Sequence, residues 1–255
     1  MERITGLSAL LTHRRLRRAL AFSSVLLITA MIAPLSSSPA GALEQRLASC
    51  STAADSVTGA ANTGQLITVV APTSSSETAT LEFYVRQGGC FRLADGPYAA
   101  HVGRNGLSPH HHEGDDTTPI GLFAIQSTMY GVLPNPGVAY GYHRLVCGDW
   151  WDEQSTSPLY NHFVHVTCGT TPNFDGGSEA LWDTVPSYDY FAVIAYNRHP
   201  IVPGRGSAIF LHVSDGRATT GCVSIPASDL VPILRALKPN LNPLIDITTS
   251  QALAS

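Results

Sequence analysis

The chain consists largely of short runs of strand-forming residues that are separated by turns. With 22 glycines and 17 prolines, most runs meet a turn signal before they reach the length of an ordinary helix. One stretch, from Pro226 to about Leu237, begins with a helix N-cap signal. Such a chain is predicted to fold into a mainly β domain with one or two short helices. The runs that predict strands are 65–71, 78–86, 90–94, 98–103, 120–126, 191–196, 208–213, 223–225 and 242–248.

Residues 132–183 depart from this pattern. They are rich in glycine, proline and aromatic residues, and they show little regular periodicity. A segment of that length without strong elements is usually functional or cross-linked. We therefore expect this segment to be held by a covalent link.

The first 42 residues have the organisation of a secretory signal peptide. Five arginines precede an apolar run at 19–35, residues 36–39 break the helix, and 40–42 form an Ala-Gly-Ala cleavage site. We expect 1–42 to be removed, 43–64 to be a flexible lead-in, and 65–255 to be the folded domain. Two alternatives remain open, namely an uncleaved membrane anchor and a lipoprotein signal that ends at Cys50.

The charge of the expected mature chain excludes some classes of partner. Removal of the leader leaves 10 basic and 18 acidic residues, a net charge of −8 with neutral histidines. This balance disfavours nucleic acid and anionic membrane surfaces as partners. After cleavage we expect no stable membrane span, and we expect a secreted monomer.

All five cysteines lie after the expected leader. In an oxidising exterior, an odd number implies two disulfides and one free thiol. If Cys222 is the free one, three pairings of the other four are open. We favour Cys147–Cys168, because these cysteines flank a single segment rich in Trp, Tyr and Pro. We also favour Cys50–Cys90, because this bond would attach the mature N-terminus to the folded domain.

Two neighbouring strand runs carry the residue types of nucleophilic catalysis. The run 208–213 contains His212 near its end, and Gly221-Cys222 opens the run that follows. Strands joined by a short loop would bring His212 and Cys222 to the same end of a sheet, within hydrogen-bond reach. A thiol nucleophile needs such a base, and a glycine beside it lets backbone N–H groups face a developing oxyanion.

This motif resembles the signature of the L,D-transpeptidase (YkuD-type) catalytic domain, which has a histidine, a spacer and then Ser/Thr-His-Gly-Cys. Thr219 matches the Ser/Thr of that pattern, and Gly221-Cys222-Val223 matches the nucleophile turn. Residues 103–106 and 113–121 resemble the family's upstream glycine-rich and G-x-T-P-x-G blocks. The segment 190–197, leading into 206–212, resembles a branch of exported actinobacterial members.

The sequence departs from that family pattern at two positions. Thr220 stands where most members carry a second histidine, and Ser224 replaces the usual Asn or Arg. The spacer between His212 and Cys222 is also shorter than usual. These changes fall in the region that the resemblance assigns to recognition of the donor peptide.

The resemblance implies a YkuD-like β-sandwich or barrel and an exported, cell-wall-associated acyltransferase. It implies that Cys222 forms a thioester with peptidoglycan stem peptides, which it then cross-links or trims. His212 would act as the base, oriented by the backbone carbonyl of Val213, and the Gly221 and Cys222 amides would hold the oxyanion. No cofactor is implied. The expected substrate-binding residues are Thr219, Thr220, Ser224 and Asn197.

Two alternatives belong to other functional classes. One is a catalytically idle cell-wall-binding module that retains the fold. The other is a metal-dependent peptidase that uses the histidines and acidic residues at 110–116. Because three consecutive histidines cannot easily share one tetrahedral ion, we interpret 110–112 as a surface loop and expect no metal.

Overall fold

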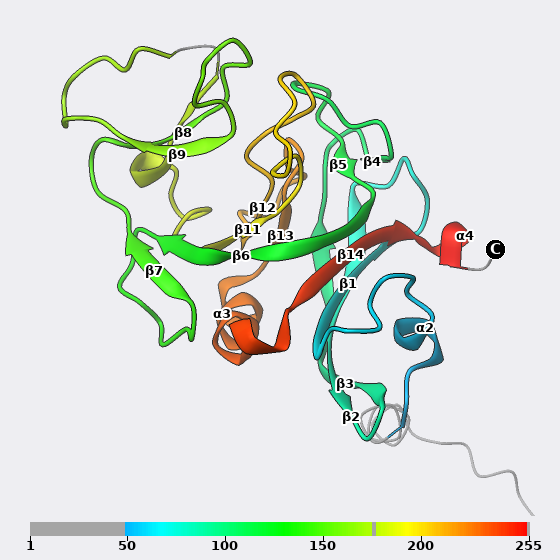
Figure 1. Cartoon of the computed structure of the whole chain (residues 1–255). Helices are drawn as coiled ribbons and strands as arrows, with labels where there is room; N and C mark the ends of the chain where they lie inside the picture. Colours follow the sequence, from blue (N-terminus) through cyan, green and yellow to red (C-terminus); the bar gives the residue numbers. More distant parts are fainter. Residues whose placement is uncertain (1–48, 175–176, 254–255) are drawn as a thin grey trace, which may run out of the picture. The chain divides into compact units, whose positions relative to one another are not determined.

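A computed structural model describes residues 49–174 and 177–253. The expected signal peptide and its cleavage site lie outside the described residues. Within them, nine strands form the main sheet in the order β11-β12-β13-β3-β2-β1-β14-β6-β7 (Figure 1). These strands are β1 (Gln65–Ala71), β2 (Thr78–Gln87), β3 (Cys90–His101), β6 (Gly121–Gly131), β7 (Gly141–Arg144), β11 (Phe191–Ile194), β12 (Phe210–Val213), β13 (Val223–Ile225) and β14 (Leu244–Thr249).

The main sheet closes into a barrel because β11 also pairs with β6. Strand β7 lies outside this ring and pairs only with β6. Closure leaves the ring without free edges and lets side chains from all its strands meet in one core. The predicted mainly β, barrel-like class is therefore confirmed.

Most strand predictions agree with the structure, with one informative difference. The runs 90–94 and 98–103 were expected to be separate strands, divided by a turn at 95–97. They form the single strand β3, in which the pairing register with β2 shifts near Phe83. Gly96 has a φ of +96°, and a Cβ there would lie 2.9 Å from the Leu81 carbonyl oxygen. The turn signal therefore marks a β-bulge.

Helices and small sheets complete the fold. The longest described helix, α3 (Ala227–Ala236), forms where the sequence predicted a helix, and it buries Leu230, Ile233 and Leu234 in the main core. The others are α2 (Thr52–Asp55), η1 (Leu181–Asp183), η2 (Pro239–Leu241) and α4 (Ser250–Leu253), and the strands β4 (Leu107–Ser108) and β5 (Thr118–Pro119) pair with each other. Among the helices of the described ranges, none has the length and apolar character needed to cross a membrane.

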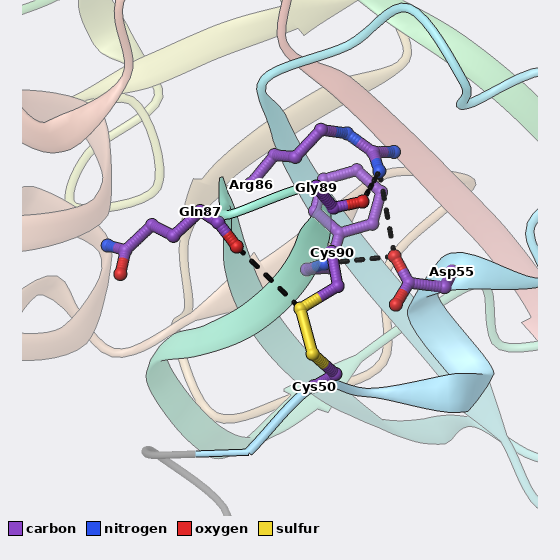
Figure 2. Close-up of a disulfide and its surroundings, with 7 residues drawn as sticks. Cys50, Asp55, Arg86, Gln87, Gly89 and Cys90 are labelled. Atoms are coloured by element: carbon purple, nitrogen blue, oxygen red, sulfur yellow. Dashed lines mark hydrogen bonds and ion pairs between the residues drawn. A yellow bond between two sulfur atoms is a disulfide. The ribbon is translucent and has the colours of Figure 1, made fainter.

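A disulfide and a partly exposed salt bridge hold the start of the described chain against the barrel (Figure 2). Cys50 is bonded to Cys90, as expected. Asp55 at the end of α2 accepts a hydrogen bond from the backbone N–H of Phe91 at 2.9 Å and lies 3.6 Å from the Arg86 guanidinium. The described part of the expected flexible lead-in therefore packs against the barrel, and its Ala54 and Ala60 are buried.

The segment 132–183 carries a second sheet that periodicity did not predict. Its strands are β8 (Asp149–Asp152), β9 (His162–His165) and β10 (Glu179–Ala180), in the order β10-β8-β9. The expected Cys147–Cys168 disulfide closes the base of the β8–β9 hairpin. Buried Trp151 packs edge-on against Phe210 of the barrel, with ring centres 5.0 Å apart. This packing joins the second sheet to the outer face of β12.

Candidate active site

Strands β12 and β13 pair in parallel and alternate between two environments. His212 is the register partner of Ser224, so these two side chains lie next to each other on the same face. The main-core face carries Leu211, Val213, Val223 and Ile225, and the opposite face carries Phe210, His212, Cys222 and Ser224. The sheet therefore places the histidine and the cysteine on one face.

Cys222 is the free cysteine of the described residues, and its thiol is buried. The thiol donates a hydrogen bond to the Ala208 carbonyl oxygen at 3.2 Å and accepts one from the Phe210 N–H at 3.3 Å. Within the described ranges, no hydrogen bond joins Cys222 to His212. The expected direct contact is therefore not formed in this conformation, because the thiol is turned toward the backbone that precedes β12.

The two upstream motif blocks hold the backbone of the Cys222 turn. The hydroxyl of buried Thr118 donates to the Cys222 carbonyl oxygen at 3.3 Å and accepts from the Gly103 N–H at 2.7 Å. The Arg104 N–H donates to the Thr219 carbonyl oxygen at 2.9 Å. The blocks 103–106 and 113–121 thus form the rear wall of the turn, which explains why they occur together with it.

The backbone conformation and close neighbours of position 221 require a glycine there. It has a φ of +145°, and a Cβ on it would lie 3.1 Å from the Thr117 carbonyl oxygen. Its N–H already donates to the Thr219 hydroxyl at 3.1 Å, and that hydroxyl donates to the Cys222 carbonyl oxygen at 2.7 Å. In this conformation, Thr219 organises the turn. The Gly221 N–H, which was expected to bind the oxyanion, is already engaged in its hydrogen bond to Thr219.

The imidazole of His212 is fixed in one tautomer. Its Nδ1 lies 2.8 Å from the Val213 carbonyl oxygen, the interaction that the family resemblance implies. Because a carbonyl oxygen only accepts, Nδ1 carries the proton, and the neutral ring keeps its lone pair on Nε2. The ring also packs edge-on against Tyr188, with ring centres 5.7 Å apart.

Burial keeps both groups neutral near pH 7. It lowers the pKa of His212 to about 4, against an opposing effect of the Val213 carbonyl. Burial also raises the pKa of the Cys222 thiol well above its ordinary value, and the nearby charge of Glu179 adds to this rise. The resting pair is therefore a thiol and a neutral imidazole rather than an ion pair.

His212 and Cys222 line the same pocket, which has a volume of about 390 Å³. The predicted residues Thr219 and Thr220 also line it, and exposed Thr220 also lines a second, smaller pocket that includes Cys222. Sequence reasoning missed several other wall residues, which come from distant parts of the chain: Arg104, Glu179, Thr184, Ser187, Tyr188, Asp215, Arg217 and Ala218.

Two residues expected to bind substrate do not line either pocket. The side chain of Asn197 accepts from the Val202 N–H and donates to the carbonyl oxygens of Val202 and Gly206, so it organises its own loop. Ser224 is buried beside His212, and its hydroxyl has no hydrogen-bond partner among the described residues.

The histidines at 110–112 differ in their surroundings. His110 and His112 are exposed, but His111 is buried, which corrects the interpretation of the whole triplet as a surface loop. His111 contacts Asp115 at 2.9 Å and packs edge-on against Tyr196. Within the described ranges, no group of three His, Cys, Asp or Glu side chains has a geometry suited to a metal ion.

A family model described as the L,D-transpeptidase catalytic domain (YkuD) matches residues 67–244 of the chain. The match begins in β1 and ends at the first residue of β14, so it contains both His212 and Cys222. Comparisons with curated proteins and with solved structures found no match.

Proposed function

The chain belongs to the L,D-transpeptidase catalytic domain family, and from this premise we propose that it is a secreted acyltransferase acting on peptidoglycan stem peptides. Cys222 is the nucleophile and His212 is its base. The observation that carries the proposal is a free thiol and a tautomer-locked neutral imidazole in the wall of one pocket. This is the residue pair that thiol acyl transfer requires.

The first half-reaction forms a thioester. The Cys222 side chain turns away from the Ala208 carbonyl toward Nε2 of His212, which takes the thiol proton. The sulfur attacks the carbonyl carbon of the third stem residue, the C–N bond to the terminal D-amino acid breaks, and His212 gives its proton to the leaving amine. Proton transfer coupled to attack suits a pair in which both partners are neutral at rest.

The second half-reaction releases the acyl group. An amine of a neighbouring stem peptide, or water, attacks the thioester carbonyl and restores the thiol. The Cys222 amide is the oxyanion donor that we propose, and the Gly221 amide can join it only if Thr219 releases its hydrogen bond. Thr219 and Thr220 lie along the pocket wall that the donor peptide would follow.

The family and the two disulfides support a location at the cell wall. We propose that the mature protein begins near Leu43, after signal cleavage, and acts as a monomer without a cofactor. N-terminal sequencing of the secreted protein tests the start. A first residue at Met1, or a diacylated Cys50, would contradict it.

A carbapenem provides the test of the nucleophile, because a β-lactam acylates an active thiol without needing an acceptor. Mass spectrometry should find one adduct on the wild-type protein, located at Cys222. Cys222→Ser should form none, since His212 deprotonates an alcohol far less readily. His212→Ala should acylate more slowly by about 10²–10⁴-fold, the usual effect of losing a general base.

His110→Ala is the matched control, because it removes an exposed histidine outside both pockets. It should acylate at the wild-type rate, and EDTA should have no effect. If His212→Ala acylates as fast as wild type at neutral pH, the pairing with Cys222 is wrong. A wild-type protein that binds the cell wall but forms no adduct would be the idle binding module instead.

A further inference from the structure

The loop that leads into β12 contains a strained residue beside the nucleophile. Ala208 is buried and has a φ of +52°, in the left-handed region that a residue with a Cβ rarely adopts. Its carbonyl oxygen accepts the hydrogen bond of the Cys222 thiol at 3.2 Å. Such backbone conformations persist only where the surroundings impose them, and they gather at functional sites. Ala208 therefore needs a partner that holds its backbone in this conformation.

Asn161, which directly precedes β9 of the second sheet, is that partner. It is 2% exposed, and its Oδ1 accepts from the N–H of Ala208 at 3.2 Å and from Nε1 of Trp151 at 3.0 Å. Its Nδ2 donates to the carbonyl oxygens of Asn197 at 2.9 Å and Tyr196 at 3.4 Å. Because both ends of the amide are engaged, the side chain has one orientation. It thereby fixes the peptide group that precedes Ala208.

A second contact joins the same two segments. The carboxylate of Glu113 accepts a hydrogen bond from the hydroxyl of Tyr160 and another, at 2.8 Å, from the hydroxyl of Ser207. Tyr160 and Ser207 directly precede Asn161 and Ala208 in the chain. Two consecutive residues of the β8–β9 hairpin therefore hold two consecutive residues of the loop before β12. That loop is fixed to the second sheet at both positions.

The contact with Ala208 favours the resting form of the nucleophile. A carbonyl oxygen only accepts, so it stabilises the thiol and not the thiolate. Burial and the nearby charges of Glu179 and Glu153 raise the thiol pKa and act in the same direction. In acylation the proton must instead reach Nε2 of His212. The contact with Ala208 therefore has to break before the sulfur can attack.

We propose that Asn161 is a positioning residue that, through the backbone of Ala208, holds Cys222 in a latched state that must open for acyl transfer. The inference rests on the acyl transfer proposed above. The latch opens when Ala208 leaves the left-handed region and its carbonyl turns away from the sulfur, which frees the thiol to rotate toward His212. The strain at Ala208 favours opening, and the hydrogen bond to Asn161 opposes it. This balance keeps the latch closed at rest without making it permanent.

Carbapenem acylation of two variants tests the latch, because they should change the rate in opposite directions. Asn161→Ala removes the acceptor that holds the Ala208 N–H, and it should acylate about fivefold faster than wild type, the scale of one neutral hydrogen bond. Ala208→Gly keeps both backbone hydrogen bonds and removes the cost of a positive φ. It should acylate about threefold more slowly, because glycine stabilises the closed latch. Mass spectrometry of Cys222 over time measures both rates.

Damage to the fold would not imitate this pattern. A disordered site slows acylation, so a faster Asn161→Ala variant reports release of the thiol. Asn161→Asp retains the Oδ1 acceptor and should not be faster than wild type. The matched control is Asn135→Ala, which removes an exposed asparagine outside both pockets whose Oδ1 accepts from the N–H groups of its own turn at 137–138. This control should acylate at the wild-type rate.

Iodoacetamide separates the latch from the acyltransferase, because alkylation requires only the Cys222 thiol. If the wild-type protein forms no carbapenem adduct, the alkylation rate should still rise in Asn161→Ala and fall in Ala208→Gly. The rise should be the same with and without dilute urea, whereas exposure of the thiol by unfolding increases with urea.

Two results would overturn the latch. One is an Asn161→Ala variant that reacts no faster than wild type, and the other is an Ala208→Gly variant that reacts no more slowly. The second criterion decides alone if Asn161→Ala does not fold.

Discussion

At the residue scale, burial is the largest influence on the pKa of the Cys222 thiol. The pKa of His212 is lowered to about 4, so the imidazole is already neutral at every pH above that value. Burial raises the pKa of the thiol well above its ordinary value, which disfavours the thiolate at neutral pH. No titration of either group falls between pH 5 and 8, and the free protein does not hold a thiolate–imidazolium pair there.

This leads to a prediction for iodoacetamide. The second-order rate of Cys222 alkylation should rise with pH, by up to about tenfold per unit, from pH 6 to 9, because only the thiolate reacts. It should show no plateau and no inflection near the ordinary pKa of histidine. Stopped alkylation followed by peptide mapping measures it. A plateau reached below pH 8 would mean that an ion pair exists after all.

The sequence could indicate the two central residues but not their present contacts. A histidine and a cysteine on neighbouring strand runs were enough to predict that both lie at the same end of a sheet, because a short loop joins the two runs. The side-chain rotamer of Cys222 and the hydrogen bond that occupies Gly221 depend on atoms of Ala208 and Thr219. Glu153 and Glu179 carried no local signal, since the second sheet brings them to the thiol.

At the scale of single elements, strand β14 contains a partly buried carboxylate that opposes folding at neutral pH. Asp246 pairs in register with Thr68 of β1 and Leu122 of β6. Burial raises its pKa to about 6. An acid whose pKa is higher in the folded state favours folding while it is protonated. The contribution of Asp246 to the free energy of unfolding therefore falls as pH rises from about 4 to 6, and it is constant above pH 6.

Asp246→Asn should therefore stabilise the protein at pH 7. We expect a gain of about 1 kcal/mol in the free energy of unfolding, since partial exposure lets solvent screen the charge. At pH 3.5 the difference should nearly vanish, because the native carboxyl is then neutral. Urea unfolding at the two pH values measures it, with Glu77→Gln as the exposed control. An equal effect at both pH values would point to packing rather than ionisation.

Element boundaries were predictable where a strand is regular and bounded by turns. β1 and β13 have the ranges that were read from the sequence. β3 was divided wrongly because a bulge uses the same Asp-Gly-Pro residues as a turn. The strands within 132–183 are short, and their burial comes from contact with the barrel rather than from their own pattern. Such long-range contacts cannot be predicted from local periodicity.

At the scale of the whole molecule, two disulfides close loops of unequal length. The Cys50–Cys90 bond spans 40 residues and the Cys147–Cys168 bond spans 21. Loop-closure entropy predicts that replacing each pair by serine lowers the free energy of unfolding by about 4 and about 3 kcal/mol, respectively.

Denaturant titration of the two double variants measures these losses. Loss of Cys147–Cys168 should also change tryptophan fluorescence, because the contact of Trp150 with Trp182 lies next to that loop. Loss of Cys50–Cys90 should leave the fluorescence of the folded state unchanged. A different result would be that loss of Cys147–Cys168 lowers the free energy of unfolding by much more than loss of Cys50–Cys90. That result would mean that native-state contacts rather than chain entropy dominate the effect of the shorter loop.

The pairing of β1 with β14 determines the order in which the chain can complete its fold. β14 lies between β1 and β6, so until residues 244–249 have been synthesised both of those strands have an unpaired edge. The partial barrel exposes apolar surface and open hydrogen-bonding groups during that time. A product that stops before Leu244 should therefore be insoluble and a target for proteases, even though it contains both His212 and Cys222. The barrel around the site therefore closes only after β14 has been added.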